Sequence, residues 1–272
     1  MRMSWKLGRI AGIDIYIHST FLLLLFFPGM ATAGLLLVLV FGCVLLHELG
    51  HALAARRFGI DTADITLYPI GGVARLNRIP KAPGAEFLIA LAGPAVNFAI
   101  VLILLALGIL FHALGVHGLI DELLDWLMII NLSLGLFNLI PAFPMDGGRI
   151  LRAGLSGWLG RARATSIAAT IGRTLALAFG IYCLFGWTLG SGEGEGPNFI
   201  QAALAAFIYL AGTAEERQVL AEERLHRFEG LRNDAGIWNA PPGYRWVQRG
   251  DGIWQLSPNL AAYPETHYRT AP

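Results

Sequence analysis

The stretch "FGCVLLHELGHALAARRFG", residues 41–59, places three ionisable side chains inside an otherwise apolar run. His47 and His51 are four residues apart, so on a helix their imidazoles share one face and can bind one metal ion, with Glu48 beside the first of them. Ionisable groups are costly in hydrocarbon and need a reason to be there. The stretch therefore has three interpretations: a buried ion pair, a soluble zinc-binding helix, or a hydrolytic site within a membrane.

The composition favours a membrane protein. Hydrophobic residues make up 55% of the 272 residues, charged residues only 14%, and the mean hydropathy is +0.57. A typical soluble domain carries about 25% charged residues, and a membrane-spanning helix needs roughly 20 apolar ones. We predict an all-α polytopic membrane protein with six transmembrane helices, at about 17–27, 33–55, 86–110, 124–141, 166–189 and 199–213.

The distribution of basic residues predicts the orientation. With the N-terminus inside and six crossings, all 20 Lys and Arg residues fall on the cytoplasmic side, which is the bias that cytoplasmic loops show. We therefore expect both termini in the cytoplasm. The alternative, a signal peptide cleaved near residue 33, is disfavoured because residues 13–17 alternate between apolar and polar side chains, as a strand does.

Outside the spans, the pattern predicts a small membrane-associated β-sheet and a tail. Residues 10–17 read as a strand and residues 60–80 as two short strands around a turn. An edge of this sheet could receive an extended peptide, or the segment could be purely structural. We predict a six-helix domain over residues 1–215 and a cytoplasmic tail over 216–272, with a charged helix and then a Trp-containing β-hairpin.

Two histidines make an incomplete site, because catalytic zinc usually has three protein ligands. The best third ligand is Asp146, in "FNLIPAFPMDGGR" (residues 137–149) at the cytoplasmic end of the fourth span. Two prolines in this stretch break the helix, which is tolerable in a membrane only beside protein or a cavity. Asn138 offers an amide near the same place. For Asn138 and Asn97, interhelical hydrogen bonding and a catalytic role both stay open.

Four motifs occur in a fixed order: "HELGH" (47–51), "PIGGVARL" (69–76), "AGPAVN" (92–97) and "FNLIPAFPMDGGR" (137–149). Together they resemble the site-2 protease family (M50) of intramembrane zinc metalloproteases, over roughly residues 5–215. The opening residues resemble its sporulation-type branch. The chain departs from that branch because the 59 residues after the last predicted span are too few for the cystathionine-β-synthase-like domains common there. We also expect no PDZ domain between the second and third predicted spans.

The resemblance implies roles for individual residues. In the family two histidines and an aspartate bind one zinc ion, which implies His47, His51 and Asp146 here. The family glutamate matches Glu48 as general base, and the asparagine that assists substrate or oxyanion binding matches Asn138.

The same resemblance implies a function: a zinc metalloendopeptidase that performs regulated intramembrane proteolysis in a bacterial inner membrane. Its partners would be the lipid bilayer and a single-span substrate, such as an anti-sigma factor or a membrane-tethered regulator, and no nucleic acid. Two alternatives use the same residues: a metal or proton transporter, disfavoured because no internal repeat appears, and a non-proteolytic membrane adaptor.

Overall fold

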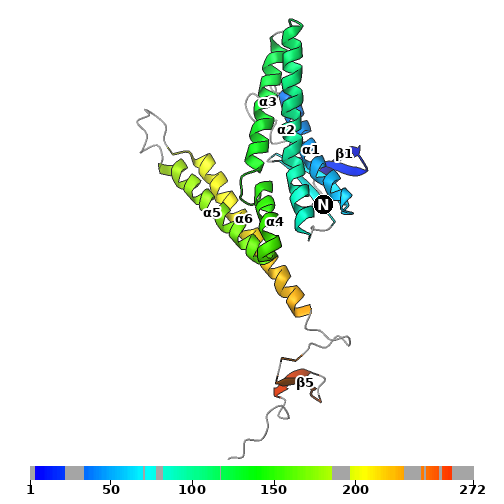
Figure 1. Ribbon diagram of the computed structural model, residues 1–272, viewed down its shortest axis with the longest axis vertical. Helices are drawn as coiled ribbons and strands as arrows, with labels where there is room; N and C mark the ends of the chain where they lie inside the picture. The colour runs from blue at the N-terminus through cyan, green and yellow to red at the C-terminus, as the bar shows by residue number, and fades with distance from the viewer. Residues whose placement is uncertain are drawn as a thin grey trace, which may run out of the picture. The chain divides into compact units, whose positions relative to one another are not determined.

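The computed structural model is mostly helical, with six helices and two small sheets among the residues that it describes (Figure 1). These residues are 4–21, 34–69, 71–77, 82–116, 118–185, 197–229, 240–241, 243–250 and 253–258. Contacts divide the chain into two units, Met1–Arg217 and Gln218–Pro272. The helices are α1 (Gly34–Arg57), α2 (Pro83–Ala113), α3 (Leu119–Asn138), α4 (Asp146–Leu159), α5 (Arg161–Phe185) and α6 (Phe199–Glu229).

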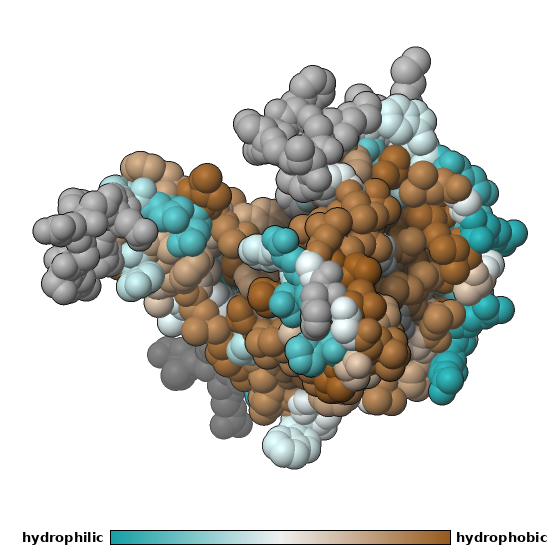
Figure 2. Space-filling model, turned by 90° about the horizontal axis from the view of Figure 1, so that it is seen from above, coloured by the Kyte–Doolittle hydropathy of each residue, from teal (hydrophilic) through white to brown (hydrophobic). Residues whose placement is uncertain are grey.

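Helix α2 is the centre of the first unit, because α1, α3 and α4 all pack against it (Figure 1). The close packing of α1 on α2 depends on Gly50, where a Cβ atom would lie 2.8 Å from Val96 Cγ2. Helix α6 lies along α5, where a Cβ atom at Gly180 would lie 3.2 Å from the Cβ of Ala205. Apolar residues cover much of the face seen in Figure 2, as expected for helices that face lipid.

Among the described residues, three helices are long and apolar enough to cross a membrane: α1, α2 and α5. The predicted count of six spans is therefore not supported. Helix α3 carries Asp121, Glu122 and Asp125 in its first two turns, and the apolar start of α6 runs on into a charged segment. Most of the predicted first span lies outside the described residues. The membrane character is confirmed, and the all-α class fits only in part because of the sheet.

The small sheet has the strand order β1-β2-β3-β4, with β1 (Ser4–Ile10), β2 (Ile13–His18), β3 (Thr62–Tyr68) and β4 (Gly71–Leu76). Its outer pairs are antiparallel, whereas β2 and β3 are parallel and α1 lies between them in the chain. Ile13 and Ile65 pack against Leu49 and Ala52 of α1. This contact fixes the sheet beside the turn of α1 that carries His47, Glu48 and His51. The sequence indicated three of the strands but not β1.

The segment before Asp146 differs from the prediction. Helix α3 ends at Asn138 instead of continuing to residue 141, and Asp146 begins a separate helix, α4, which the sequence did not predict. Ala142, Phe143 and Met145, in the segment that joins the two helices, are buried, and they pack against α5 and α6. A proline lacks the N–H that would continue a helix, so the two prolines of this segment explain the break.

The second unit contains the end of α6 and a hairpin of β5 (Tyr244–Gln248) with β6 (Trp254–Pro258). The charged helix that we predicted after the last span is a direct continuation of α6. Trp246 lies opposite Leu256 in the hairpin. Residues 251–252, between the two strands of the predicted hairpin, lie outside the described residues, and the domain boundary at residue 215 stays a prediction.

Replacing Ile65 by Ala should destabilise the first unit by about 2–5 kcal/mol, because the side chain is fully buried against α1 and the change leaves a cavity. Thermal unfolding of the purified protein in detergent measures this. Val73→Ala in the adjacent strand β4 is the matched control, with an expected change within about 0.5 kcal/mol because Val73 is 49% exposed. Equal losses for the two variants would contradict this account of the sheet.

Candidate metal centre

The structure brings His47, His51 and Asp146 together. His51 Nε2 lies 3.1 Å from His47 Nε2 and 3.1 Å from Asp146 Oδ2, and His47 Nε2 lies 3.3 Å from the same carboxylate oxygen. The two histidines come from adjacent turns of α1 and the aspartate from the first residue of α4. All three residues are buried, each 7% exposed. Among the described residues they form the one group of three side chains placed to hold a metal ion.

The outer nitrogen of each imidazole has a partner that sets the ring's tautomer. His51 Nδ1 donates to the backbone carbonyl oxygen of Ile89, at 2.7 Å, and His47 Nδ1 donates to Asn97 Oδ1, at 2.6 Å. A carbonyl oxygen can only accept, so the proton of a neutral imidazole is held on Nδ1. Each Nε2 then presents a lone pair toward the other ligands.

Three electron-rich atoms therefore converge within a buried site. Without a cation, the lone pairs of these atoms would repel one another. A divalent metal relieves this repulsion directly. Two neutral imidazoles and a carboxylate, with a fourth position open to water or substrate, are a ligand set of catalytic zinc. The residues present thus fit a zinc ion.

Two buried side-chain amides, those of Asn97 and Asn131, orient His47 through a chain of hydrogen bonds. Asn131 Nδ2 donates to the carbonyl oxygen of Leu127, at 2.8 Å, so its Oδ1 faces Asn97 and accepts from Asn97 Nδ2, at 3.3 Å. Asn97 Oδ1 is thereby turned toward His47. Both amides are fully buried. Asn97 thus makes the interhelical hydrogen bond that was one of its two predicted roles, and this bond orients His47; a catalytic role for Asn97 stays a prediction. Asn131 was missed, although it too is a polar residue in an apolar run.

Gly93 of α2 lies against the metal ligands themselves. A Cβ atom at this position would lie 2.2 Å from His51 Nε2 and 2.7 Å from His47 Cε1. No side chain fits between α2 and the two imidazoles, so the helix backbone forms one wall of the centre. The motif "AGPAVN" therefore supplies both this glycine and Asn97 to the metal centre.

The side chain of Glu48 extends from α1 toward the sheet and is half-buried. Its Oε2 accepts a hydrogen bond from the backbone N–H of Ala74 in β4, at 3.2 Å. A Cβ atom at Gly72 would lie 2.5 Å from Glu48 Cγ, so this strand passes directly over the carboxylate. The glycines of "PIGGVARL" thus let the strand approach Glu48.

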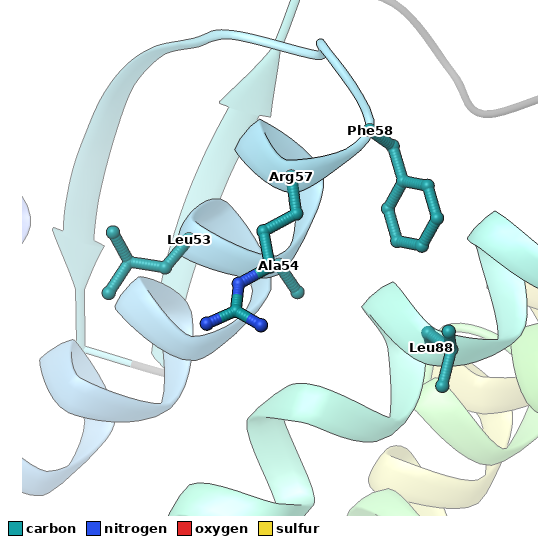
Figure 3. A pocket seen from close by; sticks show the side chains of 5 residues that line it. All are labelled: Leu53, Ala54, Arg57, Phe58 and Leu88. Carbon is teal, nitrogen blue, oxygen red and sulfur yellow. The ribbon is translucent and has the colours of Figure 1, made fainter.

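Asn138 is the last residue of α3 and is half-buried. Among the described residues it makes no hydrogen bond to His47, His51, Asp146 or Glu48, so its role stays a prediction. A separate cavity of about 500 Å³ is lined by Leu53, Ala54, Arg57, Phe58 and Leu88, at the C-terminal end of α1 and the start of α2 (Figure 3). Its lining contains none of the metal-ligating residues.

Comparison with known proteins shows which family this chain belongs to. The family model "Peptidase family M50" matches residues 35–179, more than half of the chain, and this range includes Glu48 and the three metal-ligating residues. The chain belongs to peptidase family M50. The site-2 protease resemblance is thereby confirmed, and the sporulation-type branch stays a prediction.

Individual relatives agree with this assignment. A zinc metalloprotease of Methanocaldococcus jannaschii is 42% identical over 229 residues, which is 82% of this chain and 63% of the relative. Rip3 of Mycobacterium tuberculosis, also named as a zinc metalloprotease, is 32% identical over 291 residues, covering 97% of this chain and 72% of its own length. The solved structure of a site-2 protease from M. jannaschii has a TM-score of 0.54 and 38% identity, and covers 78% of this chain and 95% of that one.

These relatives and the cluster of His47, His51 and Asp146 together fit a single zinc site. The chain spans 63% of the length of the archaeal zinc metalloprotease.

Replacing Asn97 by Leu should weaken zinc binding by about 10- to 100-fold, because His47 Nδ1 loses the acceptor that fixes its tautomer and ring orientation. Competition with a chelator of known affinity measures the zinc dissociation constant. Asn138→Leu is the matched control and should bind zinc like the wild type. Tight zinc binding by the Asn97 variant would show that the amide does not orient the ligand.

Proposed function

We propose that this chain is an intramembrane zinc metalloprotease that hydrolyses peptide bonds in or near transmembrane segments of membrane proteins. The observation that carries the proposal is the buried convergence of His47 and His51 with Asp146. The two histidines and Glu48 lie on α1, a helix apolar enough to cross a membrane, and Asp146 begins α4. The family supports the same chemistry. No observation favours the transporter or the adaptor.

Each side chain of the site has its own role in peptide hydrolysis. Bound zinc would supply Lewis acidity, which polarises the scissile carbonyl and makes water acidic enough to react near neutral pH. Glu48 acts as the general base: Ala74 N–H occupies its Oε2, which leaves Oε1 to take the proton from water and later deliver it to the leaving amine. The Asn97 and Ile89 contacts hold the imidazoles in place throughout. We propose that Asn138 binds the substrate backbone near this site.

The sheet suggests how a substrate is held. Strand β4 is at the edge of the described sheet, and Ala74 directs its N–H toward Glu48, away from β3. We propose that an extended segment of the substrate pairs with this edge. Pairing requires a helical substrate to unwind, which exposes the carbonyl that a helix would otherwise hide. A membrane protein whose transmembrane helix unwinds readily, such as an anti-sigma factor or a tethered regulator, fits this requirement.

The charge distribution and the sheet support a membrane orientation. Because β2 and β3 are hydrogen-bonded, they lie on one side of the membrane, and α1, about 36 Å long at 1.5 Å per residue, ends near β3. The N-terminal end of α1 therefore lies toward the opposite side. We propose that the chain crosses the membrane an even number of times, with α3 and α6 among its spans. We propose that both termini, including the tail from residue 216, are cytoplasmic and that the membrane is a bacterial inner membrane.

The variant Glu48→Gln should bind zinc like the wild type but lose cleavage of a membrane-tethered reporter, because its side chain cannot accept the proton. Reporter cleavage in proteoliposomes and zinc content measure the two properties. Glu222→Gln, a change on α6 at a half-buried residue whose hydrogen-bond partner is Gln218 of the same helix, is the control and should cleave normally. Normal cleavage by Glu48→Gln would contradict the mechanism, and zinc uptake without any cleavage would favour the transporter.

A further inference from the structure

A second group of buried charges lies outside the metal centre. Arg152 of α4 is 2% exposed, and its Nε donates to Glu86 Oε1 of α2, at 2.8 Å. Its Nη1 donates to Glu215 Oε1 of α6, at 2.5 Å. The mechanism of peptide hydrolysis uses none of these three residues. A buried ion pair loses much of its favourable hydration, so this one calls for an explanation.

Arg152 lies on the helix that begins at Asp146, and it contacts the loop that precedes Asp146 in the chain. It lies on the same helix as Asp146, and its guanidinium stacks over the ring of Phe143, with Cζ 5.1 Å from the ring centre. Phe143 belongs to the loop that leads into α4, and it packs against Ala168 and Ala169 of α5. Arg152 therefore restrains the loop before the metal ligand as well as the helix behind it.

Glu86, the partner of Arg152, lies on α2, the helix that also positions both histidines. Glu86 is one turn before Ile89, whose carbonyl oxygen holds His51, and the same helix carries Asn97, which holds His47. All three metal ligands are thus positioned against α2, two through their imidazoles and Asp146 through Arg152. A metal centre demands this precision, because ligands must be held within about 0.5 Å of the productive geometry.

We propose that Arg152 is a positioning residue for the zinc ligand Asp146, and that Glu215 of α6 acts through Arg152 to set the affinity of the centre for zinc. The proposal rests on the zinc centre of the proposed function, but it does not depend on proteolysis. It predicts that a change on α6, a helix that contributes no ligand, alters metal binding.

The chain offers a matched pair of neighbouring carboxylates for the test. Glu215 contacts Arg152 of α4, whereas Glu216 accepts from Arg173, at 2.7 Å, and from Ser166, both on α5. Both glutamates join α6 to another helix by an ion pair. In the described contacts, only Glu215 reaches the helix that bears Asp146.

The experiment uses the full chain, purified in detergent, with the variants Glu215→Ala, Glu216→Ala and Arg152→Lys. Three quantities are measured: the zinc dissociation constant by chelator competition, the visible absorption spectrum of the cobalt-substituted protein, and the unfolding temperature. Glu215→Ala and Arg152→Lys should weaken zinc binding by about tenfold or more and change the cobalt spectrum. Glu216→Ala should lower only the unfolding temperature.

Wild-type zinc affinity in both Glu215→Ala and Arg152→Lys would overturn the inference and leave the proposed function intact. Equal weakening by Glu215→Ala and Glu216→Ala would also overturn it, because the effect would then be general loosening of α6. If Arg152→Lys does not fold, the comparison of the two glutamate variants decides alone. A wild-type chain that binds no zinc would overturn both proposals.

Discussion

The structure depends on one constraint: three electron-rich atoms, two imidazole nitrogens and a carboxylate oxygen, must converge in a buried place. A water-filled site would tolerate this convergence, but burial makes it unfavourable unless a cation is present. The surroundings follow from that constraint. Amide and carbonyl acceptors hold protons away from the facing nitrogens, Gly93 leaves room for the rings, and α2 serves as the common support for ligands that come from α1 and α4.

Much of the centre could be predicted because its ligands are unusual residue types for their position. Histidines in an apolar run need a reason, and Asp146 follows a helix break that only a packed or hydrated site explains. The supporting contacts could not be predicted in the same way. The partner of His51 is a backbone carbonyl, which any residue at position 89 could supply. Arg152 was predicted only to lie on the cytoplasmic side with the other basic residues, and nothing in the sequence indicated that it is buried against Glu86.

The helices show where hydropathy alone fails. A short amphipathic helix such as α4, 14 residues long, gives no transmembrane signal, and the two prolines before it indicated only the end of the preceding helix. Helix α3 begins with acidic residues and α6 continues into a charged segment, so hydropathy alone does not identify either as a membrane span. The small sheet was partly predictable, because alternation marks a strand. Its parallel pairing of β2 with β3 was not, since pairing depends on the path of α1.

That parallel pairing has a consequence for how the chain is made. Strand β2 leaves the ribosome early, but its partner β3 follows α1, so the pair can form only after α1 has been inserted. Asp146 is synthesised 95 residues after His51. While α1 is being inserted, the two histidines therefore lack their contact with Asp146, and Glu48 lacks its contact with strand β4. Until α4 docks, the cluster therefore lacks Asp146, the third side chain that the proposed zinc chemistry needs.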